Sequence, residues 1–459
     1  MPSMPPMPPP SRPPAAAGSR LDPHHDRYAA RARTMTASEI RALFAVASRP
    51  EVVSLAGGMP YLRALPLDDI ARLVERVVAE RGTEALQYGS GQGDPDLREA
   101  ICTVMAEVGI AAHPDEVVVT AGSQQALDLV TRIFVDPGDV VLAEAPSYVG
   151  ALGTFRSYEA EVRHVAMDGD GLLPDALRAA LDRLAAEGRT ATMLYTVPSF
   201  HNPAGVTATP SRRAEILGIA RDAGLLVLED DPYALLGFDG PAPRALRADD
   251  PEGATVVYLG SFSKTFAPGL RVGWALAPHA VRDKLVLASE ATQLCPSSFA
   301  QLTVAEYLRT QPWREQVKVY REIYRERRDA LLDALAELMP SGTTWTSPLG
   351  GFYVWLTLPP GLDAAQMLPL AVGERVAYVP GSAFYAGATD TGADDTAEQA
   401  ARSLRLSYCY PEPDRIREGV RRLAAVIERE LELRATFGPA GGAAPGSGPV
   451  GAAPSPDTA

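Results

Sequence analysis

Apolar side chains recur along residues 33–277 with two alternating periodicities, one typical of helices and the other typical of strands. The strand-like runs are almost wholly apolar, as expected when both faces of a sheet are covered. The expected helices are Arg33–Ser48, Asp68–Arg81, Asp96–Val108, Gln124–Phe134, Ser147–Ser157, Pro174–Ala186 and Ser211–Ala223, and the expected strands are Glu116–Thr120, Val140–Ala143, Val162–Val165, Met193–Thr196, Leu225–Glu229, Val256–Leu259 and Gly273–Ala277. This alternation predicts an α/β fold with an open, mostly parallel, doubly wound sheet.

The order of elements changes in the last third of the chain. A long helix is expected over Trp313–Leu338, then strands at Phe352–Leu356, Val376–Val379 and Leu404–Tyr408, and a final helix over Asp414–Leu433. This α+β order predicts a second, smaller domain. The expected division is a disordered Pro-rich tail (1–30), an N-terminal segment that packs with the small domain and the active site (31–75), a large domain (76–310), a small domain (311–435) and a disordered tail (436–459).

Composition narrows the class of protein. The 57 acidic against 43 basic residues give a net charge of −14, and no basic patch is dense enough to suggest nucleic acid or an anionic membrane. The three cysteines lie far apart, without the spacing of a metal site or a disulfide framework, so reduced structural thiols are expected. The sequence contains no run of about 20 apolar residues that would predict a membrane span, and its N-terminus lacks the apolar core of a secretory signal. We therefore expect a cytoplasmic protein.

Lys264 lies in an unusual run, Ser261–Trp274, in which two serines precede it and Arg271 follows it. Gly and Pro residues interrupt this hydroxyl-rich run, so Lys264 does not have the setting of an ordinary surface lysine. The hydroxyls and the guanidinium suit a phosphate, and a lysine beside a bound phosphate can form an imine with an aldehyde cofactor that carries one. The sequence therefore indicates pyridoxal 5′-phosphate (PLP) bound to Lys264.

A second segment can contribute to the same phosphate site, where an expected strand leads into an expected helix. Gly122 permits a close backbone turn, and Ser123 can cap the helix, whose free N–H groups then face any anion placed there. A Gly-Ser helix start is also common as a cap alone. The segment gains weight because Ser261, Ser263 and Arg271 can complete the cradle.

Polar and aromatic groups that follow three expected strands can meet the cofactor ring. Asp230 lies at the carboxyl end of a strand, where open α/β sheets bind ligands, and its carboxylate can pair with a protonated pyridine nitrogen. Tyr233 and Asn202 can donate to the phenolate oxygen of the ring, and Tyr148 offers a flat face for stacking. The structural alternatives are an acidic turn, an Asn-Pro turn and a buried tyrosine.

Arg405 stands inside an otherwise apolar expected strand. Burying a guanidinium is costly unless an anion accompanies it, and a substrate carboxylate is its natural bidentate partner. A structural Arg–Asp pair is the alternative.

Together these motifs resemble the aspartate aminotransferase superfamily, the class I/II group of PLP-dependent aminotransferases, over roughly residues 33–433. The resemblance rests on the SxSKxFxPGxRxGW run around Lys264, the NPxG run at Asn202 and the Asp-x-x-Tyr at Asp230. Ser54–Pro60 and Glu229–Tyr233 are most similar to the branch of 2-aminoadipate and kynurenine aminotransferases, and also to the aminotransferase-like domain of MocR-type regulators. The resemblance implies the aspartate aminotransferase-like fold.

The resemblance also implies residue roles. Lys264 is the Schiff-base lysine and proton carrier, Arg405 binds the substrate α-carboxylate, and Tyr88 reaches the phosphate from the neighbouring subunit of a homodimer. The implied cofactor-binding residues are Ser123, Gln124, Tyr148, Asn202, Asp230, Tyr233, Ser261, Ser263, Lys264, Arg271 and Tyr88, the implied substrate-binding residues are Arg405, Asn202, Gly57 and Gly58, and Lys264, Asp230 and Tyr233 are the catalytic set.

The expected reaction is transamination between an L-amino acid and a 2-oxo acid, with 2-oxoglutarate as the expected acceptor. The same scaffold supports PLP-dependent elimination, cyclisation or oxidation, and the sequence does not separate these reactions from transamination. A MocR-type regulator needs an N-terminal winged helix-turn-helix domain, and only about 30 residues, rich in Pro and Ala, precede the aminotransferase-like region. Tyr61 and Arg63 are hypothetical selectors of the substrate side chain.

Overall fold

The computed structural model describes residue 22 and residues 24–33, 49–387 and 393–438. The expected helix over Arg33–Ser48 therefore lies almost wholly outside the described residues; its first residue closes the short helix α1 (Ala30–Arg33).

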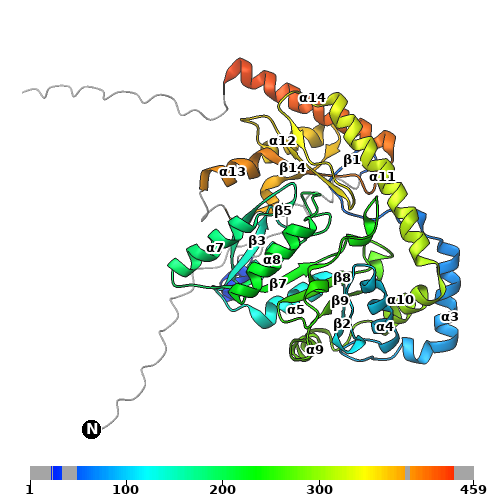
Figure 1. Ribbon diagram of the computed structural model, residues 1–459. Helices are drawn as coiled ribbons and strands as arrows, with labels where there is room; N and C mark the ends of the chain where they lie inside the picture. Colours follow the sequence, from blue (N-terminus) through cyan, green and yellow to red (C-terminus); the bar gives the residue numbers. More distant parts are fainter. Residues whose placement is uncertain (1–21, 23, 34–48, 388–392, 439–459) are drawn as a thin grey trace, which may run out of the picture.

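A large sheet of eight strands forms the centre of the molecule (Figure 1). Its order is β2-β9-β8-β7-β6-β3-β4-β5, and the core pairs from β8 to β4 run parallel, whereas β9 is antiparallel to both of its neighbours. The strands are β2 (Val117–Thr120), β3 (Val140–Ala145), β4 (Glu161–Asp168), β5 (Gly171–Leu172), β6 (Ala191–Thr196), β7 (Leu226–Asp230), β8 (Val256–Ser261) and β9 (Gly273–Leu276). The sheet is mixed and mostly parallel, as predicted.

Helices cover both faces of this sheet, which is why its strands read as continuous apolar runs. On β2, Val118 packs into one core with helices α5, α6 and α9, whereas Val117 and Val119 face another core with α4 and α10. Helices α7 and α8 cover the rest of that second face. These helices are α4 (Pro95–Ala106), α5 (Ser123–Phe134), α6 (Val149–Ser157), α7 (Pro174–Ala186), α8 (Pro210–Ala223), α9 (His279–Gln293) and α10 (Ser298–Thr310).

Helix α8 shows how local sequence sets the bounds of these elements. Thr209 caps its first turn by accepting a hydrogen bond from the backbone N–H of Arg212, and Pro210 occupies the first helical position. Gly224 ends the helix in the left-handed conformation, with a φ of 62°.

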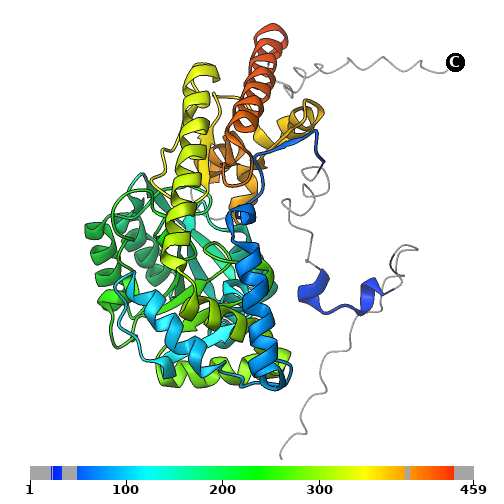
Figure 2. The same cartoon turned by 90° about the vertical axis from the view of Figure 1, so that its right-hand side faces the viewer.

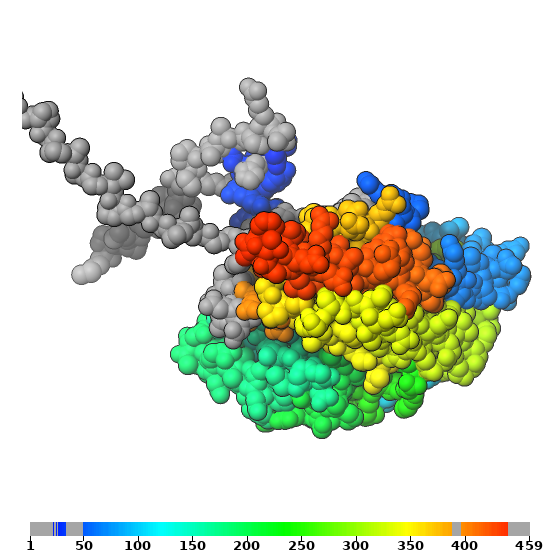
Figure 3. Space-filling view, turned by 90° about the horizontal axis from the view of Figure 1, so that it is seen from above, coloured from blue at the N-terminus to red at the C-terminus, as the bar shows by residue number. Residues whose placement is uncertain are grey.

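The C-terminal part forms a separate layer above one end of the large sheet (Figures 1 and 3). Its antiparallel sheet has the order β10-β11-β14-β13, and the long helices α11 and α14 lie side by side against it. The elements are α11 (Trp313–Leu338), β10 (Thr344–Trp345), β11 (Tyr353–Thr357), α12 (Ala364–Gly373), β12 (Val376–Ala377), β13 (Val379–Pro380), α13 (Ala393–Arg402), β14 (Ser403–Ser407) and α14 (Pro413–Phe437).

The N-terminal segment joins the two parts. Strand β1 (Val53–Ser54) pairs with β12 of the C-terminal part, and helix α3 (Leu67–Ala85) then runs along the edge of the large part (Figure 2). The expected division between residues 75 and 76 falls inside α3.

Helices α9, α10, α12 and α13 were not predicted from the sequence, and the strand expected over Val376–Val379 is two short strands, β12 and β13. In the described residues, no helix has the length and apolar character needed to cross a bilayer.

Candidate active site

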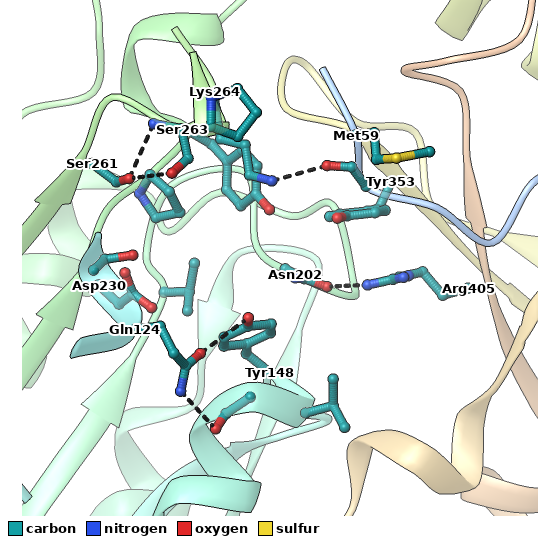
Figure 4. A pocket seen from close by; sticks show the side chains of 18 of the residues that line it. Met59, Gln124, Tyr148, Asn202, Asp230, Ser261, Ser263, Lys264, Tyr353 and Arg405 are labelled. Atoms are coloured by element: carbon teal, nitrogen blue, oxygen red, sulfur yellow. Dashed lines mark hydrogen bonds between the residues drawn. The ribbon is translucent and has the colours of Figure 1, made fainter. Parts of the chain in front are cut away.

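A cavity of about 400 Å³ opens where the parallel strands of the large sheet end, between that sheet and the C-terminal part (Figure 4). A volume of this size suits a small organic cofactor and its substrate. The segments that follow β3, β6, β7 and β8 all reach it, because the carboxyl ends of parallel strands lie on one edge. Its lining includes Gly58, Met59, Ser123, Gln124, Tyr148, Asn202, Asp230, Tyr233, Ser261, Ser263, Lys264, Arg271, Tyr353 and Arg405.

Lys264 projects into this cavity from the loop after β8 (Figure 4). Its amine donates a 2.9 Å hydrogen bond to the carbonyl oxygen of Gly58. Burial lowers the pKa of the amine from 10.5 to about 8, and the positive charges of Arg405 and Arg271 act in the same direction. The chain has two other lysines, Lys284 and Lys318, and both are exposed.

Asp230 ends β7 and faces the same cavity. Its Oδ2 accepts a 2.8 Å hydrogen bond from the hydroxyl of Tyr195, while its buried Oδ1 has no partner. Burial raises the pKa of Asp230 to about 6, although the Tyr195 hydrogen bond and the charge of Lys264 lower it. Sequence reasoning missed Tyr195, which reaches Asp230 because β6 and β7 are neighbours in the sheet.

The predicted phosphate residues gather at the start of α5. The Ser261 hydroxyl donates to that of Ser263 at 2.8 Å, and Arg271 approaches the Ser263 hydroxyl at 3.4 Å. Gly122 has a φ of 86°, and a Cβ there would lie 2.3 Å from the guanidinium of Arg271, so no larger residue fits without displacing that group. The predicted cap was wrong: Gly122 is the N-cap, and Ser123 is the first residue of the helix.

The other residues predicted to contact the cofactor ring also lie at the cavity. The side chain of Gln124 accepts from the Tyr148 hydroxyl at 3.3 Å and donates to Thr154 at 2.9 Å, so within this chain it holds Tyr148 in place. Burial raises the pKa of Tyr148 to about 12. The hydroxyl of Tyr233 is hydrogen-bonded to that of Tyr353, a cavity residue that the sequence reading did not single out.

Arg405 lies on β14 beside Asn202, on the side of the cavity away from Asp230 (Figure 4). Its guanidinium donates to Asn202 Oδ1 and to the Ala56 carbonyl, each at 2.8 Å, and lies over the ring of Tyr353 with 4.2 Å to the centroid. The Nε atom is buried without a partner. The side-chain oxygen of Asn202 accepts from Arg405, so the side-chain N–H groups of Asn202 can donate hydrogen bonds to another group.

The opening segment closes one side of the cavity. Gly58 lines it, and a Cβ on Gly58 would overlap the Tyr353 hydroxyl at 2.0 Å. Gly57, the other residue of this segment predicted to contact substrate, is not among the residues that line the cavity. Tyr88, 76% exposed, is also absent from the lining within this chain.

The hypothetical selectors do not line the cavity either. Tyr61 packs on the guanidinium of Arg327, 3.9 Å from the ring centroid, and Arg63 lies in the exposed turn η2 (Leu62–Ala64).

The donor set fits pyridoxal 5′-phosphate. The unpaired Oδ1 of Asp230 suits a protonated pyridine nitrogen, and the cluster of Ser263, Arg271 and the first N–H groups of α5 suits a phosphate. The unpaired Nε of Arg405 leaves capacity for a carboxylate.

Comparison with known proteins establishes the family to which the chain belongs. The family model for aminotransferase class I and II matches residues 50–423. The chain belongs to this family. Aromatic-amino-acid aminotransferase 1 of Thermococcus litoralis is 40% identical over 407 residues, which cover 88% of this chain and 95% of that protein. The chain is also similar to a helix-turn-helix transcriptional regulator, YisV of Bacillus subtilis, at 31% identity over 83% of this chain and 75% of the regulator.

Solved aminotransferase structures show the same fold and carry the cofactor. Kynurenine aminotransferase of Pyrococcus horikoshii, in complex with PMP, superimposes with a TM-score of 0.83 at 38% identity, over 90% of this chain and all of that one. The α-aminoadipate aminotransferase LysN of Thermus thermophilus, complexed with N-(5′-phosphopyridoxyl)-L-leucine, gives 0.80 at 35% identity, over 89% and 99% of the two chains. This aminotransferase has the aspartate aminotransferase-like fold and uses pyridoxal phosphate.

Proposed function

We propose that Lys264 carries the cofactor and moves the proton in an amino-group transfer from an aromatic L-amino acid to 2-oxoglutarate. The observation that supports this most directly is the convergence of the Lys264 amine, the Asp230 carboxylate and the Arg405 guanidinium on one cavity. The name of the Thermococcus relative and the cavity lining of Tyr148, Tyr353 and Met59 support an aromatic donor.

The chain's own residues supply the proton chemistry. Bound pyridoxal phosphate supplies a cationic conjugated ring that accepts the electron pair left when the substrate loses its Cα proton. In this proposal Asp230 keeps the ring nitrogen protonated, with Tyr195 fixing the orientation of its carboxylate. Lys264 Nζ takes the Cα proton and would return it to C4′ of the cofactor, the carbon on the far side of the nitrogen that joins substrate and cofactor. A base must be neutral, and the lowered pKa of this amine favours that state.

The other residues orient the reactants. Ser123, Ser261, Ser263 and Arg271 hold the phosphate, Tyr148 stacks on the ring, and Gln124 holds Tyr148. Tyr233 and Asn202 donate to the phenolate oxygen, and Arg405 binds the α-carboxylate. Asn202 links these two functions because Arg405 engages its oxygen.

A donor and acceptor screen tests this function. Phenylalanine with 2-oxoglutarate is expected to give phenylpyruvate and glutamate, both measured by chromatography. Omission of 2-oxoglutarate leaves only the first half-reaction, seen as a single turnover in the cofactor absorbance, and omission of phenylalanine leaves the PLP-bound enzyme unchanged. Pyruvate and phenylpyruvate serve as alternative acceptors. Absence of amino transfer from every donor tested would contradict the proposal and favour elimination, cyclisation or oxidation.

The pKa of Lys264 predicts how cofactor capture by the ligand-free protein depends on pH. Only the neutral amine attacks the aldehyde, so the capture rate is expected to rise with pH through a midpoint near 8. At pH 7 about a tenth of the Lys264 amine is then neutral, compared with less than about a thousandth of an ordinary lysine. Stopped-flow absorbance on the apoprotein measures the profile. A midpoint near that of free lysine would contradict the environment described for this amine.

The proposal includes a homodimer in which Tyr88 reaches the partner's phosphate site. The exposure of Leu86 (77%) and Tyr88 (76%) on one loop supports such an interface. We propose a small domain over residues 311–435 and a large domain that ends at residue 310, with the N-terminal segment 31–75 continuing into the large domain through α3. A cytoplasmic location is supported by three cysteines that are all unpaired.

A further inference from the structure

One buried pair beside the active site, a carboxylate and a histidine ring, takes no part in the proposed proton chemistry. Glu144, in β3, is 2% exposed, and His201, in the loop after β6, is 1% exposed. The ring Nε2 of His201 lies 3.0 Å from the Glu144 carboxylate. A buried carboxylate is costly unless it is compensated, so this pair calls for a physical explanation.

Glu144 is tied to the strand and loop that lead to Asn202. Its carboxylate accepts hydrogen bonds from the Thr196 hydroxyl at 2.7 Å and from the backbone N–H of Val197 at 2.8 Å. Burial raises its pKa, but the His201 ring and these two donors more than offset that effect, so its pKa lies below the ordinary value. The carboxylate of β3 therefore remains charged and fixes the end of β6 and the loop beyond it.

His201 holds the turn that carries Asn202. Its Nδ1 accepts from the backbone N–H of Ala204 at 3.2 Å, and its backbone N–H donates to the carbonyl of Val206 at 2.8 Å. Because Nδ1 is an acceptor, the ring proton lies on Nε2, which is 3.0 Å from the Glu144 carboxylate without being aligned for a full hydrogen bond. The ring thus connects the sheet to a turn whose next residue, Asn202, is bound to Arg405 on the cavity side.

We propose that Glu144, acting through His201, is a positioning residue that fixes Asn202 for both its cofactor contact and its Arg405 contact. This inference rests on the proposed function, because it assumes that Asn202 donates to the phenolate oxygen. Neither Glu144 nor His201 lines the cavity, so the pair acts on the reaction only through Asn202.

Two substitutions of His201 separate this role from simple support of the turn. In His201→Asn the side-chain oxygen can take the place of Nδ1 and keep the Ala204 contact, but the shorter side chain loses Glu144. In His201→Gln the terminal amide can take the place of Nε2 and keep Glu144, but it loses the Ala204 contact. The two variants are similar in polarity and differ in which contact survives.

The readout is the pH titration of the visible absorbance of the PLP-bound enzyme, with Asn202→Ala as the reference. Loss of the Asn202 donor destabilises the anionic phenolate, so Asn202→Ala is expected to raise the titration midpoint by about one pH unit. His201→Asn is expected to reproduce most of that shift and to lower kcat/KM about tenfold. His201→Gln is expected to stay within about twofold of the wild type in kcat/KM, with little shift.

The inference would be overturned if the two His201 variants behaved alike, or if only His201→Gln shifted the titration midpoint. The proposed function would still stand in that case, provided that Asn202→Ala shifted the midpoint as expected. An Asn202→Ala enzyme with an unchanged titration would instead contradict the proposed role of Asn202, and the inference with it. Thermal unfolding of the apoproteins checks that each variant folds. Should His201→Asn fail to fold, Glu144→Gln takes its place, with the same upward shift expected.

Discussion

Replacing Lys264 with alanine is expected to lower kcat/KM for transamination by about 10⁴-fold, the upper end of what a general base contributes. The expected loss is this large because the same amine both captures the cofactor and carries the Cα proton, so the variant loses two steps at once. Cofactor can still bind through its phosphate and ring contacts. A ping-pong assay with phenylalanine and 2-oxoglutarate measures the activity.

The small number of lysines makes the covalent part of this prediction direct to check. Borohydride treatment of the wild-type holoenzyme is expected to fix one pyridoxyl group per chain, found by peptide mass spectrometry on Lys264. Lys284→Ala, at an exposed site on α9, is the matched control and is expected to keep both the label and the activity. A label on Lys284 or Lys318, or a Lys264→Ala enzyme with wild-type turnover, would contradict the assignment.

The fold class could be predicted because the central strands are buried on both faces and alternate with amphipathic helices. Helix α11 shows the strength of a long periodic signal, since its predicted bounds, Trp313–Leu338, are those observed. Helix α10 carries no such signal. Its residues 300–305 are all buried, so no single apolar stripe marks it as a helix.

The order of strands in space could not be predicted in the same way. Strand β9 follows β8 in sequence but lies between β2 and β8, antiparallel to both. No local pattern in the sequence specifies that placement, because pairing partners far apart in sequence are chosen by packing of the whole sheet.

The candidate site shows the same limit at the level of side chains. Residues at strand ends, such as Asp230 and Asn202, could be expected to meet because parallel strands end on one edge. Tyr195 and Tyr353 lie within strands, where the sequence pattern indicates an ordinary core residue. Their roles depend on which strand is adjacent in the sheet. The Glu144–His201 contact likewise requires β3 beside β6.

The site is also electrostatically connected. Arg405 and Arg271 help to lower the pKa of Lys264, and Asp230 acts in the opposite direction. A substrate carboxylate on Arg405 would cancel part of that positive charge and raise the pKa of the amine. The lowered pKa of the free amine favours its neutral state before substrate binds, and the rise on carboxylate binding then makes that neutral amine a stronger proton acceptor.

Arg405→Lys is the second large effect we expect, with kcat/KM for phenylalanine lowered on the order of 10²–10³-fold, as for other disrupted buried charge pairs. The guanidinium binds Asn202 and Ala56 and still has an unpaired Nε for a carboxylate. Lysine keeps the positive charge near Lys264, but its single ammonium cannot make these contacts together. The loss should therefore come from carboxylate binding and not from a changed pKa of Lys264.

The decarboxylated analogue, 2-phenylethylamine, separates the two causes because it has the same ring and amine without a carboxylate. The wild-type enzyme is expected to prefer phenylalanine strongly, and Arg405→Lys is expected to lose most of that preference while its slow reaction with the amine changes little. Single-turnover absorbance of the holoenzyme with each compound gives both rates. An unchanged ratio of the two rates in the variant would show that Arg405 does not bind the α-carboxylate. If that unchanged ratio came from an equal fall in both rates, Arg405 would have a structural role through Asn202.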